Sequence, residues 1–319
     1  MPKQSKPKAV SANRRDLNDA PIVKFRDFLG INNVDSPVNI GPQHLQIAIN
    51  LDVSRDGELS LRTGQTLVAS GSTKNSIWSN KTKTICLYMD NGSLMRLNND
   101  ETSSTIATGF SASKFMNFCD GDGRIWCTNE ETIGFIKDGV YYDTYTDPID
   151  FYKVRPMPGN LIDYGHGRLW VVRGDKVWYS DGHRPTQFDL THNFMPLNGT
   201  VTLFRTVTNG IWMANSKIWF LNGTNPKADM KPTEKADYDV IPRTDRYAAG
   251  DRIGPNGMPD EPIFFLSTKG ICLGGVGGAF KNLTDRKYAP SISLNGVRTG
   301  TGVIMRTDGI NRYVATVRY

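Results

Sequence analysis

The sequence predicts an all-β fold, a six-bladed β-propeller with seven blades as the alternative, and three observations lead to this prediction. A strand–turn–strand pattern recurs six times along the chain. The turns carry residues that favour tight hairpins. Helical periodicity is scarce, so the strand pattern has no strong competitor.

The repeated unit is an apolar strand, a short polar turn and a second apolar strand. Its strands are rich in Ile, Val, Trp, Phe and Tyr, which suit a pleated surface, and its turns in Gly, Asn, Asp, Ser and Lys. Successive units start 39 to 53 residues apart, which is typical of propeller blades. The six units begin at Ile85, Arg124, Arg168, Gly210, Ile263 and Val303.

Weaker strands between these hairpins are expected to complete four-stranded blades. Residues 104–107, 139–145 and 238–241 are examples. The longest interval, residues 222–262, could hold a degenerate seventh unit, but its prolines favour an inserted loop without regular strands. These prolines are Pro226, Pro232, Pro242, Pro255 and Pro259.

Both ends of the chain carry hairpins that could close a ring. Residues 302–319 form a hairpin with no strands after it, and residues 47–53 and 58–62 flank a turn near the N-terminus. We expect the N-terminal hairpin to complete the last blade, which would remove two exposed sheet edges. Residues 21–319 would then form a single propeller domain.

The positive charge is concentrated at the N-terminus. The net charge is +6, and five basic residues lie among the first fifteen, which leaves the rest nearly neutral. We therefore predict a flexible basic arm over residues 1–20 that contacts an adjacent protein or DNA. The residues expected to make these contacts are Lys3, Lys6, Lys8, Arg14 and Arg15.

The composition argues against a membrane or secreted protein. No stretch approaches the roughly 20 apolar residues that cross a bilayer, so we expect no membrane partner. The N-terminal segment lacks the apolar core of a secretory signal. Four cysteines without a CxxC pair predict buried thiols in a protein made in a reducing cytoplasm.

No motif predicts catalysis, a metal or a cofactor, and we expect a protein that is not an enzyme. The four histidines lack zinc-site spacing. The Cys-Asp-Gly-Asp-Gly segment at 119–123 favours a hairpin turn over a calcium loop, and the glycine cluster at 274–278 favours a turn or close strand packing over a phosphate loop. Five of the six tryptophans occupy strand positions in the repeats, which predicts core packing.

Two stretches resemble proteins from the tail-gene clusters of tailed bacteriophages. The first is Gly-Ile-Asn-Asn-Val-Asp-Ser-Pro at 30–37, followed by the Ala-x-Asn-x-Asp motif and its continuation over 48–64. The second comprises residues 270–275, 280–284 and 288–290. They are similar to the opening and closing regions of one group of virion proteins.

This resemblance implies a structural component of a tailed-phage virion, made in the host bacterial cytoplasm. By fold it points to the propeller proteins of the tail nozzle, which form a homo-oligomeric ring below the portal and adaptor and help to retain or conduct the genome. The implied partners are neighbouring copies, portal, adaptor or tail proteins, and packaged DNA. A receptor- or glycan-binding tail-tip module is the alternative. A polysaccharide-degrading enzyme is a third hypothesis, which would need an axial carboxylate pair.

Overall fold

The computed structural model describes residues 27–49, 51–53, 57–61, 67–68, 70–71, 73–248, 262–285, 296–307 and 310–318. The chain divides into two compact units, residues 1–62 and 63–319, and each unit is described by itself. The basic arm expected at residues 1–20 lies outside the described residues, as do residues 288–290 of the second phage-like stretch. The expectation of one domain over residues 21–319 stays a prediction.

The described residues of the first unit form two small sheets. Strand β1 (Gly30–Ile31) pairs in parallel with β2 (His44–Leu45). Strand β3 (Leu51–Val53) pairs antiparallel with β4 (Leu59–Leu61), which confirms the hairpin predicted near the N-terminus.

The second unit contains five successive antiparallel sheets, or blades, whose strands follow sequence order. Blade 1 consists of β5 (Lys74–Ser79), β6 (Cys86–Asp90), β7 (Ser93–Leu97) and β8 (Ser103–Ala107). Blade 2 consists of β9 (Asn117–Gly121), β10 (Arg124–Thr128), β11 (Ile133–Lys137) and β12 (Val140–Tyr142).

Blade 3 has a fifth strand, because β17 pairs with β15 beside β16. It consists of β13 (Leu161–Gly165), β14 (Arg168–Arg173), β15 (Lys176–Asp181), β16 (Arg184–Phe188) and β17 (Phe194–Pro196). Blade 4 consists of β18 (Leu203–Val207), β19 (Gly210–Ala214), β20 (Ile218–Asn222) and β21 (Lys231–Ala236). Blade 5 consists of β22 (Arg246–Tyr247), β23 (Ile263–Ser267), β24 (Gly270–Gly274), the 3₁₀ turn η3 (Val276–Gly278) and β25 (Phe280–Asn282).

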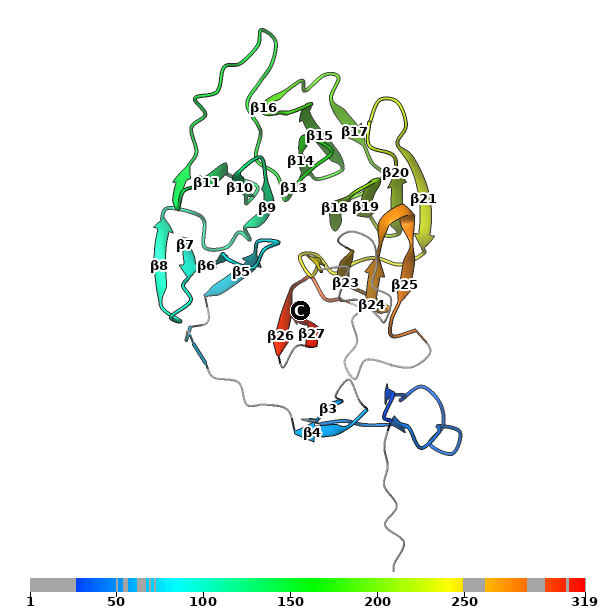
Figure 1. Cartoon of the computed structure of the whole chain (residues 1–319). Helices are drawn as coiled ribbons and strands as arrows, with labels where there is room; N and C mark the ends of the chain where they lie inside the picture. The colour runs from blue at the N-terminus through cyan, green and yellow to red at the C-terminus, as the bar shows by residue number, and fades with distance from the viewer. Residues whose placement is uncertain are drawn as a thin grey trace, which may run out of the picture. The chain divides into compact units, whose positions relative to one another are not determined.

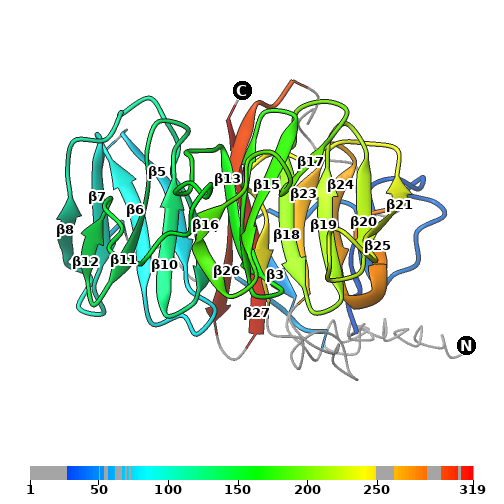
Figure 2. The ribbon, with the colours of Figure 1, turned by 90° about the horizontal axis from the view of Figure 1, so that it is seen from above.

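The first strands of the blades face a common centre. Strand β13 contacts the first strands of both neighbouring blades, β9 and β18 (Figure 1). A sixth hairpin, β26 (Thr299–Thr307) with β27 (Ile310–Arg318), places β26 against β5 and β22, and its red strands stand among the blades in Figure 2. The second unit is therefore an all-β, propeller-like arrangement of five blades and one hairpin. The predicted sixth or seventh blade and the closure by both termini stay predictions.

The repeated hairpins predicted from the sequence are confirmed. The first five form the second and third strands of the five blades, and the last is β26–β27. The weak strands expected at residues 104–107 and 139–145 correspond to β8 and β12. At residues 238–241 the structure has only an isolated bridge, between Val240 and Ser267.

The expectation of a strand-free loop over residues 222–262 was wrong. Strands β21 and β22 lie in this interval, and Pro232 is inside β21. Strand β21 is the last strand of blade 4. A proline is tolerated there because an edge strand has one side free of ladder hydrogen bonds.

The predicted core packing is confirmed for three of the five tryptophans at repeat positions, whereas Trp178 and Trp219 are only partly buried. Trp126, Trp170 and Trp212 are each the third residue of the second strand in blades 2, 3 and 4, and all three are fully buried. A Cβ on Gly274 would lie 2.7 Å from the Trp212 ring, and Trp212 Nε1 donates to the Gly275 carbonyl at 3.0 Å. The glycine cluster at 274–278 therefore serves close packing.

The Cys-Asp-Gly-Asp-Gly segment comprises the end of β9 and the two-residue turn before β10. Asp122 and Gly123 have φ of 57° and 66°, the left-handed conformation that a two-residue hairpin turn requires. Within the described parts of the chain, no group of His, Cys, Asp or Glu side chains could hold a metal ion. The described residues likewise include no apolar helix of bilayer-spanning length.

Candidate functional site

Charged residues gather where the first strands of the blades approach one another. Alternate residues of a strand face opposite sides, so each first strand presents side chains to both neighbouring blades. In β13, Ile162 packs in the cluster shared with blade 2, whereas Leu161 packs against blade 4. Asp163 lies on the same side as Leu161 and therefore faces β18.

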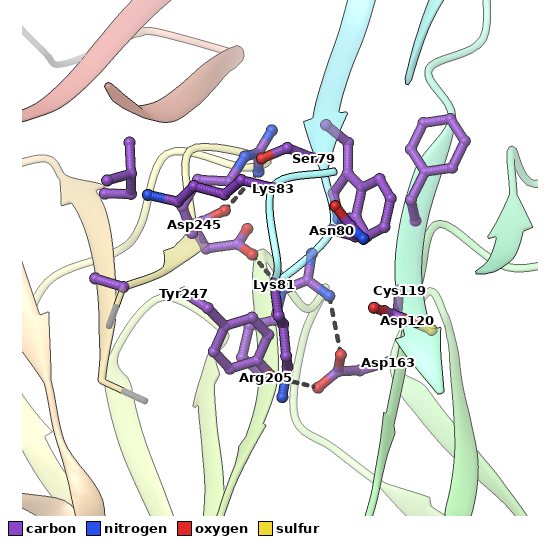
Figure 3. A pocket seen from close by; sticks show the side chains of 15 residues that line it. Ser79, Asn80, Lys81, Lys83, Cys119, Asp120, Asp163, Arg205, Asp245 and Tyr247 are labelled. Atoms are coloured by element: carbon purple, nitrogen blue, oxygen red, sulfur yellow. Dashed lines mark hydrogen bonds and ion pairs between the residues drawn. The ribbon is translucent and has the colours of Figure 1, made fainter. Parts of the chain in front are cut away.

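Arg205 in β18 is the centre of this group of charges. Its guanidinium donates through Nε to Asp245 and through Nη1 to Asp163 Oδ1 at 3.2 Å (Figure 3). Nη1 also donates to the Ile162 carbonyl at 3.0 Å. The Asp163, Arg205 and Asp245 side chains are 2%, 5% and 3% exposed, so both ion pairs are buried.

Asp163 also accepts hydrogen bonds from the neighbouring strand. Its Oδ2 lies 2.6 Å from the Thr206 backbone nitrogen and 2.8 Å from Thr206 Oγ1. The Tyr247 hydroxyl lies 3.0 Å from the same Oδ2 and 2.7 Å from the Thr206 carbonyl, and shares its single hydrogen between them. Asp163, Arg205, Asp245, Arg246 and Tyr247 are called the axial network below.

The axial network belongs to a series of polar contacts that joins every blade to the next. Ser76 Oγ accepts from the Met116 nitrogen at 2.9 Å, and Asn117 Oδ1 accepts from the Ile162 nitrogen at 3.0 Å. Asp163 and Arg205 continue the series through blades 3, 4 and 5. Arg246 Nη2 then donates to the Ile77 carbonyl at 2.6 Å, which links blade 5 back to blade 1.

The charges of the axial network stabilise one another. Burial acts to lower the pKa of Arg205, but Asp245 and Asp163 outweigh burial and raise it above its ordinary value. Burial acts to raise the pKa of Asp245, but Arg205 and Arg246 hold it below its ordinary value. Burial, together with Asp163, raises the pKa of Tyr247 well above its usual range. Arg205 and Asp245 are therefore charged and Tyr247 neutral near neutral pH.

Little space remains inside the axial network. The cavity there has a volume of about 70 Å³, whereas sites for small organic ligands usually occupy about 300–1,000 Å³. At its mouth, Lys81 Nζ lies 4.6 Å from the centre of the Tyr247 ring, and Figure 3 shows the two side chains together. Because most of its charged groups pair with one another across blades and the cavity between them is small, this arrangement is suited to holding blades together.

The ionisation of Asp245 should make stability depend on pH. A carboxyl whose pKa is lowered on folding stabilises the fold above its unfolded pKa, near 3.9, and loses this contribution as the pH falls towards the folded value. We expect the difference in unfolding free energy between the wild type and Asp245→Asn to shrink below about pH 4. Urea titrations from pH 7 to pH 3 measure it. If this difference stays constant from pH 7 to pH 3, folding does not lower the pKa of Asp245.

Sequence inspection missed the axial network, although a signal was present. The first strands contain Leu161-Ile162-Asp163 and Leu203-Phe204-Arg205, in which a charged residue follows two apolar ones at the repeat distance. The site residues that the sequence did suggest, Lys3, Lys6, Lys8, Arg14 and Arg15, lie outside the described residues.

The cysteines agree with the expectation of free thiols. Cys119, Cys127 and Cys272 are buried, Cys86 is half-buried, and none forms a disulfide. Burial raises the pKa of Cys127 to about 12, and burial also raises the pKa of Cys119 well above its usual range. These thiols therefore stay protonated, which makes them poor nucleophiles.

Comparisons with known proteins give similarity of fold only. No protein-family model matches the sequence, and no curated protein matches it either. The extracellular domain of a putative one-component system from B. thetaiotaomicron superposes with a TM-score of 0.43 at 11% identity, covering 77% of this chain and 34% of that chain. The chain thus spans about a third of that protein's length. The WD40 β-propeller domain of Doa1 gives 0.41 at 12% identity, covering 72% and 79%.

Proposed function

We propose that this chain is a non-enzymatic structural component of a tailed-phage virion. In this proposal the propeller is a rigid module of the tail or head–tail region. It contacts neighbouring copies and portal, adaptor or tail proteins in a homo-oligomeric ring, and helps to retain or conduct the packaged genome.

The observation that carries the structural role is the series of contacts between blades. Buried ion pairs and hydrogen bonds join blades 1 to 5 in turn, with Arg205 at the centre. Such contacts lose their stabilisation if one blade moves, because each separated charge would remain buried without a partner. The axial network is thus suited to keeping the blades fixed relative to one another. The surface loops remain available for contacts with partners.

The link to a phage particle rests on the sequence resemblance. In the first phage-like stretch, Asn32 is buried and its Oδ1 accepts from the backbone nitrogens of Val34 and Asp35 at 3.3 and 3.2 Å. Its Nδ2 donates to Asp35 Oδ2 at 2.9 Å. This part of the motif fixes a local turn, as Asn does when its side chain bonds to the backbone after it.

We also propose that the N-terminal hairpin completes a sixth blade. Strand β26 already contacts the first strands of blades 1 and 5, and β26–β27 is a two-stranded sheet among the described residues. A blade of four strands needs two more, and β3–β4 is an antiparallel pair of the required kind. The added strands would cover an edge that otherwise invites association with other chains.

Purified particles provide the test of the virion role. In the virus or prophage that encodes this chain, we expect the protein to sediment with particles at a fixed copy number in a density gradient. Disrupting its gene should give heads whose DNA is lost or open to nuclease. If the protein stays in the soluble fraction and the mutant particles are normal, the proposal is wrong.

A second variant tests the arm separately. Deleting residues 1–20 removes Lys3, Lys6, Lys8, Arg14 and Arg15, and we expect less protein per particle because these charges would contact a partner or DNA. The matched variant keeps the full length of the arm and replaces the five basic residues with neutral ones. Unchanged incorporation of both would contradict the role of the arm while leaving that of the propeller intact.

A further inference from the structure

The connection between β12 and β13 displays two aromatic side chains to solvent. It spans residues 143–160 and can be followed in Figure 1 as a long green excursion that rises beside β16. Phe151 and Tyr152 are 83% and 84% exposed, and their ring centres are 4.5 Å apart at an angle of 60°. Two large adjacent rings left in water are unfavourable unless they serve a contact, because apolar surface gains free energy on burial.

The backbone around this aromatic pair is firmly held. Lys153 Nζ lies 3.1 Å from Asp181 Oδ2, and Arg155 Nη2 donates to the Asp147 carbonyl at 2.6 Å. Val154 forms a backbone bridge with Phe188 at the end of β16. Such a framework fixes the direction in which the aromatic pair projects.

Tyr152 itself adopts a strained conformation. Its φ is 63°, in the left-handed region that bulky residues seldom occupy. Such a residue costs on the order of 1–3 kcal/mol and persists only where the surroundings impose it. The neighbouring contacts of Lys153 and Val154 supply that constraint. The display of the two rings is therefore a built feature of the loop.

The same loop contributes to a polar pocket of about 340 Å³. Asp150, the residue before Phe151, lines it and pairs with Arg184. These two side chains are 55% and 56% exposed, so their remaining donors and acceptors face solvent. Gln187 also lines the pocket and is almost fully buried, and its Oε1 has no hydrogen-bond partner among the described residues.

The charge of this pocket disfavours an anionic ligand. Asp147 pairs with Arg124 at 3.0 Å and Asp150 pairs with Arg184, so the two guanidinium groups are already neutralised. Asp122 adds a further carboxylate to the lining. The pocket offers donors and acceptors without net positive charge, and the loop that lines it also carries the two exposed aromatic rings. A neutral saccharide needs this combination, because it presents both hydroxyl groups and apolar C–H faces.

We propose that this loop and pocket bind a neutral saccharide, with Phe151 and Tyr152 stacking on sugar rings and the Asp150–Arg184 pair bonding to hydroxyl groups. The site involves the β9–β10 hairpin of blade 2, the β12–β13 connection and β16 of blade 3, and shares no lining residue with the axial network. It goes beyond the proposed virion role and does not depend on it.

The test uses the full-length protein and an array of neutral oligosaccharides built from hexoses and N-acetylhexosamines. We expect the wild type to bind at least one member. Phe151→Ala and Tyr152→Ala should each raise the dissociation constant, by up to about tenfold, as the loss of one aromatic contact implies. Arg184→Ala should also raise it. Leu283→Ala removes a 39% exposed side chain in blade 5 and is the matched control with unchanged binding.

The exposed positions make these variants suitable, because their thermal unfolding should match that of the wild type. The proposal is overturned if the wild type binds no member of the array, or if the Phe151→Ala/Tyr152→Ala double variant binds as the wild type does. Self-association that the double variant abolishes, without saccharide binding, would assign the surface to a protein contact instead. Particle incorporation, measured on the same variants, reports separately on the virion role.

Discussion

Replacing Arg205 with methionine is expected to destabilise the protein by about 3–5 kcal/mol, the cost of removing one partner from a buried ion pair. The substitution leaves Asp163 and Asp245 buried and close together without their shared cation. Both carboxylates are almost fully buried, so little water can replace the lost guanidinium. The free energy of unfolding, obtained from urea titrations followed by tryptophan fluorescence, measures this loss.

A surface ion pair provides the matched control. Lys114 Nζ lies 2.7 Å from Glu130 Oε2, and the two side chains are 37% and 42% exposed. Lys114→Met removes the same kind of charge from an exposed site, where solvent screens the pair and its contribution to stability is small. If Arg205→Met costs no more than Lys114→Met, the axial network does not hold the blades together.

Trp170→Ala is expected to lower the free energy of unfolding by about 3–5 kcal/mol, because it opens a cavity between blades 3 and 4. The Trp170 ring is fully buried and packs against Tyr179 and Phe204, with ring centres 5.2 and 5.7 Å away. Its Nε1 also donates to the Gly165 carbonyl at 3.0 Å.

The variant Trp170→Phe separates the two contributions of this residue. It keeps most of the apolar volume and loses the hydrogen bond, so its cost should be well below that of alanine. Equilibrium unfolding of both variants checks this order. A loss under about 1 kcal/mol for Trp170→Ala would mean that the blades close over the gap, against the dense packing expected of an interior.

The repeat and its hairpins could be predicted because their signals are local. Apolar runs on either side of a polar turn of two to four residues define each hairpin, as at Asp90 and Ser93, which pair across the turn between β6 and β7. The same repeat places a tryptophan at the third residue of three successive hairpins. These residues are Trp126, Trp170 and Trp212.

The first strands and the axial network could not be predicted in the same way. Strand β22 has two residues, too few for a periodic pattern. Charged residues such as Arg205 usually indicate exposed positions, and its partners Asp163 and Asp245 lie about one repeat away on either side. Their proximity arises only when neighbouring blades pack. The exposure of Phe151 and Tyr152 could not be predicted either, since aromatic residues between strands fit a buried position just as well.

The ion pairs around Arg205 also limit what can be threaded through a single copy of the protein. The cavity inside the axial network has a volume of about 70 Å³, which admits a few water molecules. A DNA duplex is far larger, since its major groove alone is about 12 Å wide. If copies assemble into the proposed ring, a passage for a genome would be walled by the outer surfaces of several copies. Its bore would then be set by the number of subunits and by their peripheral loops.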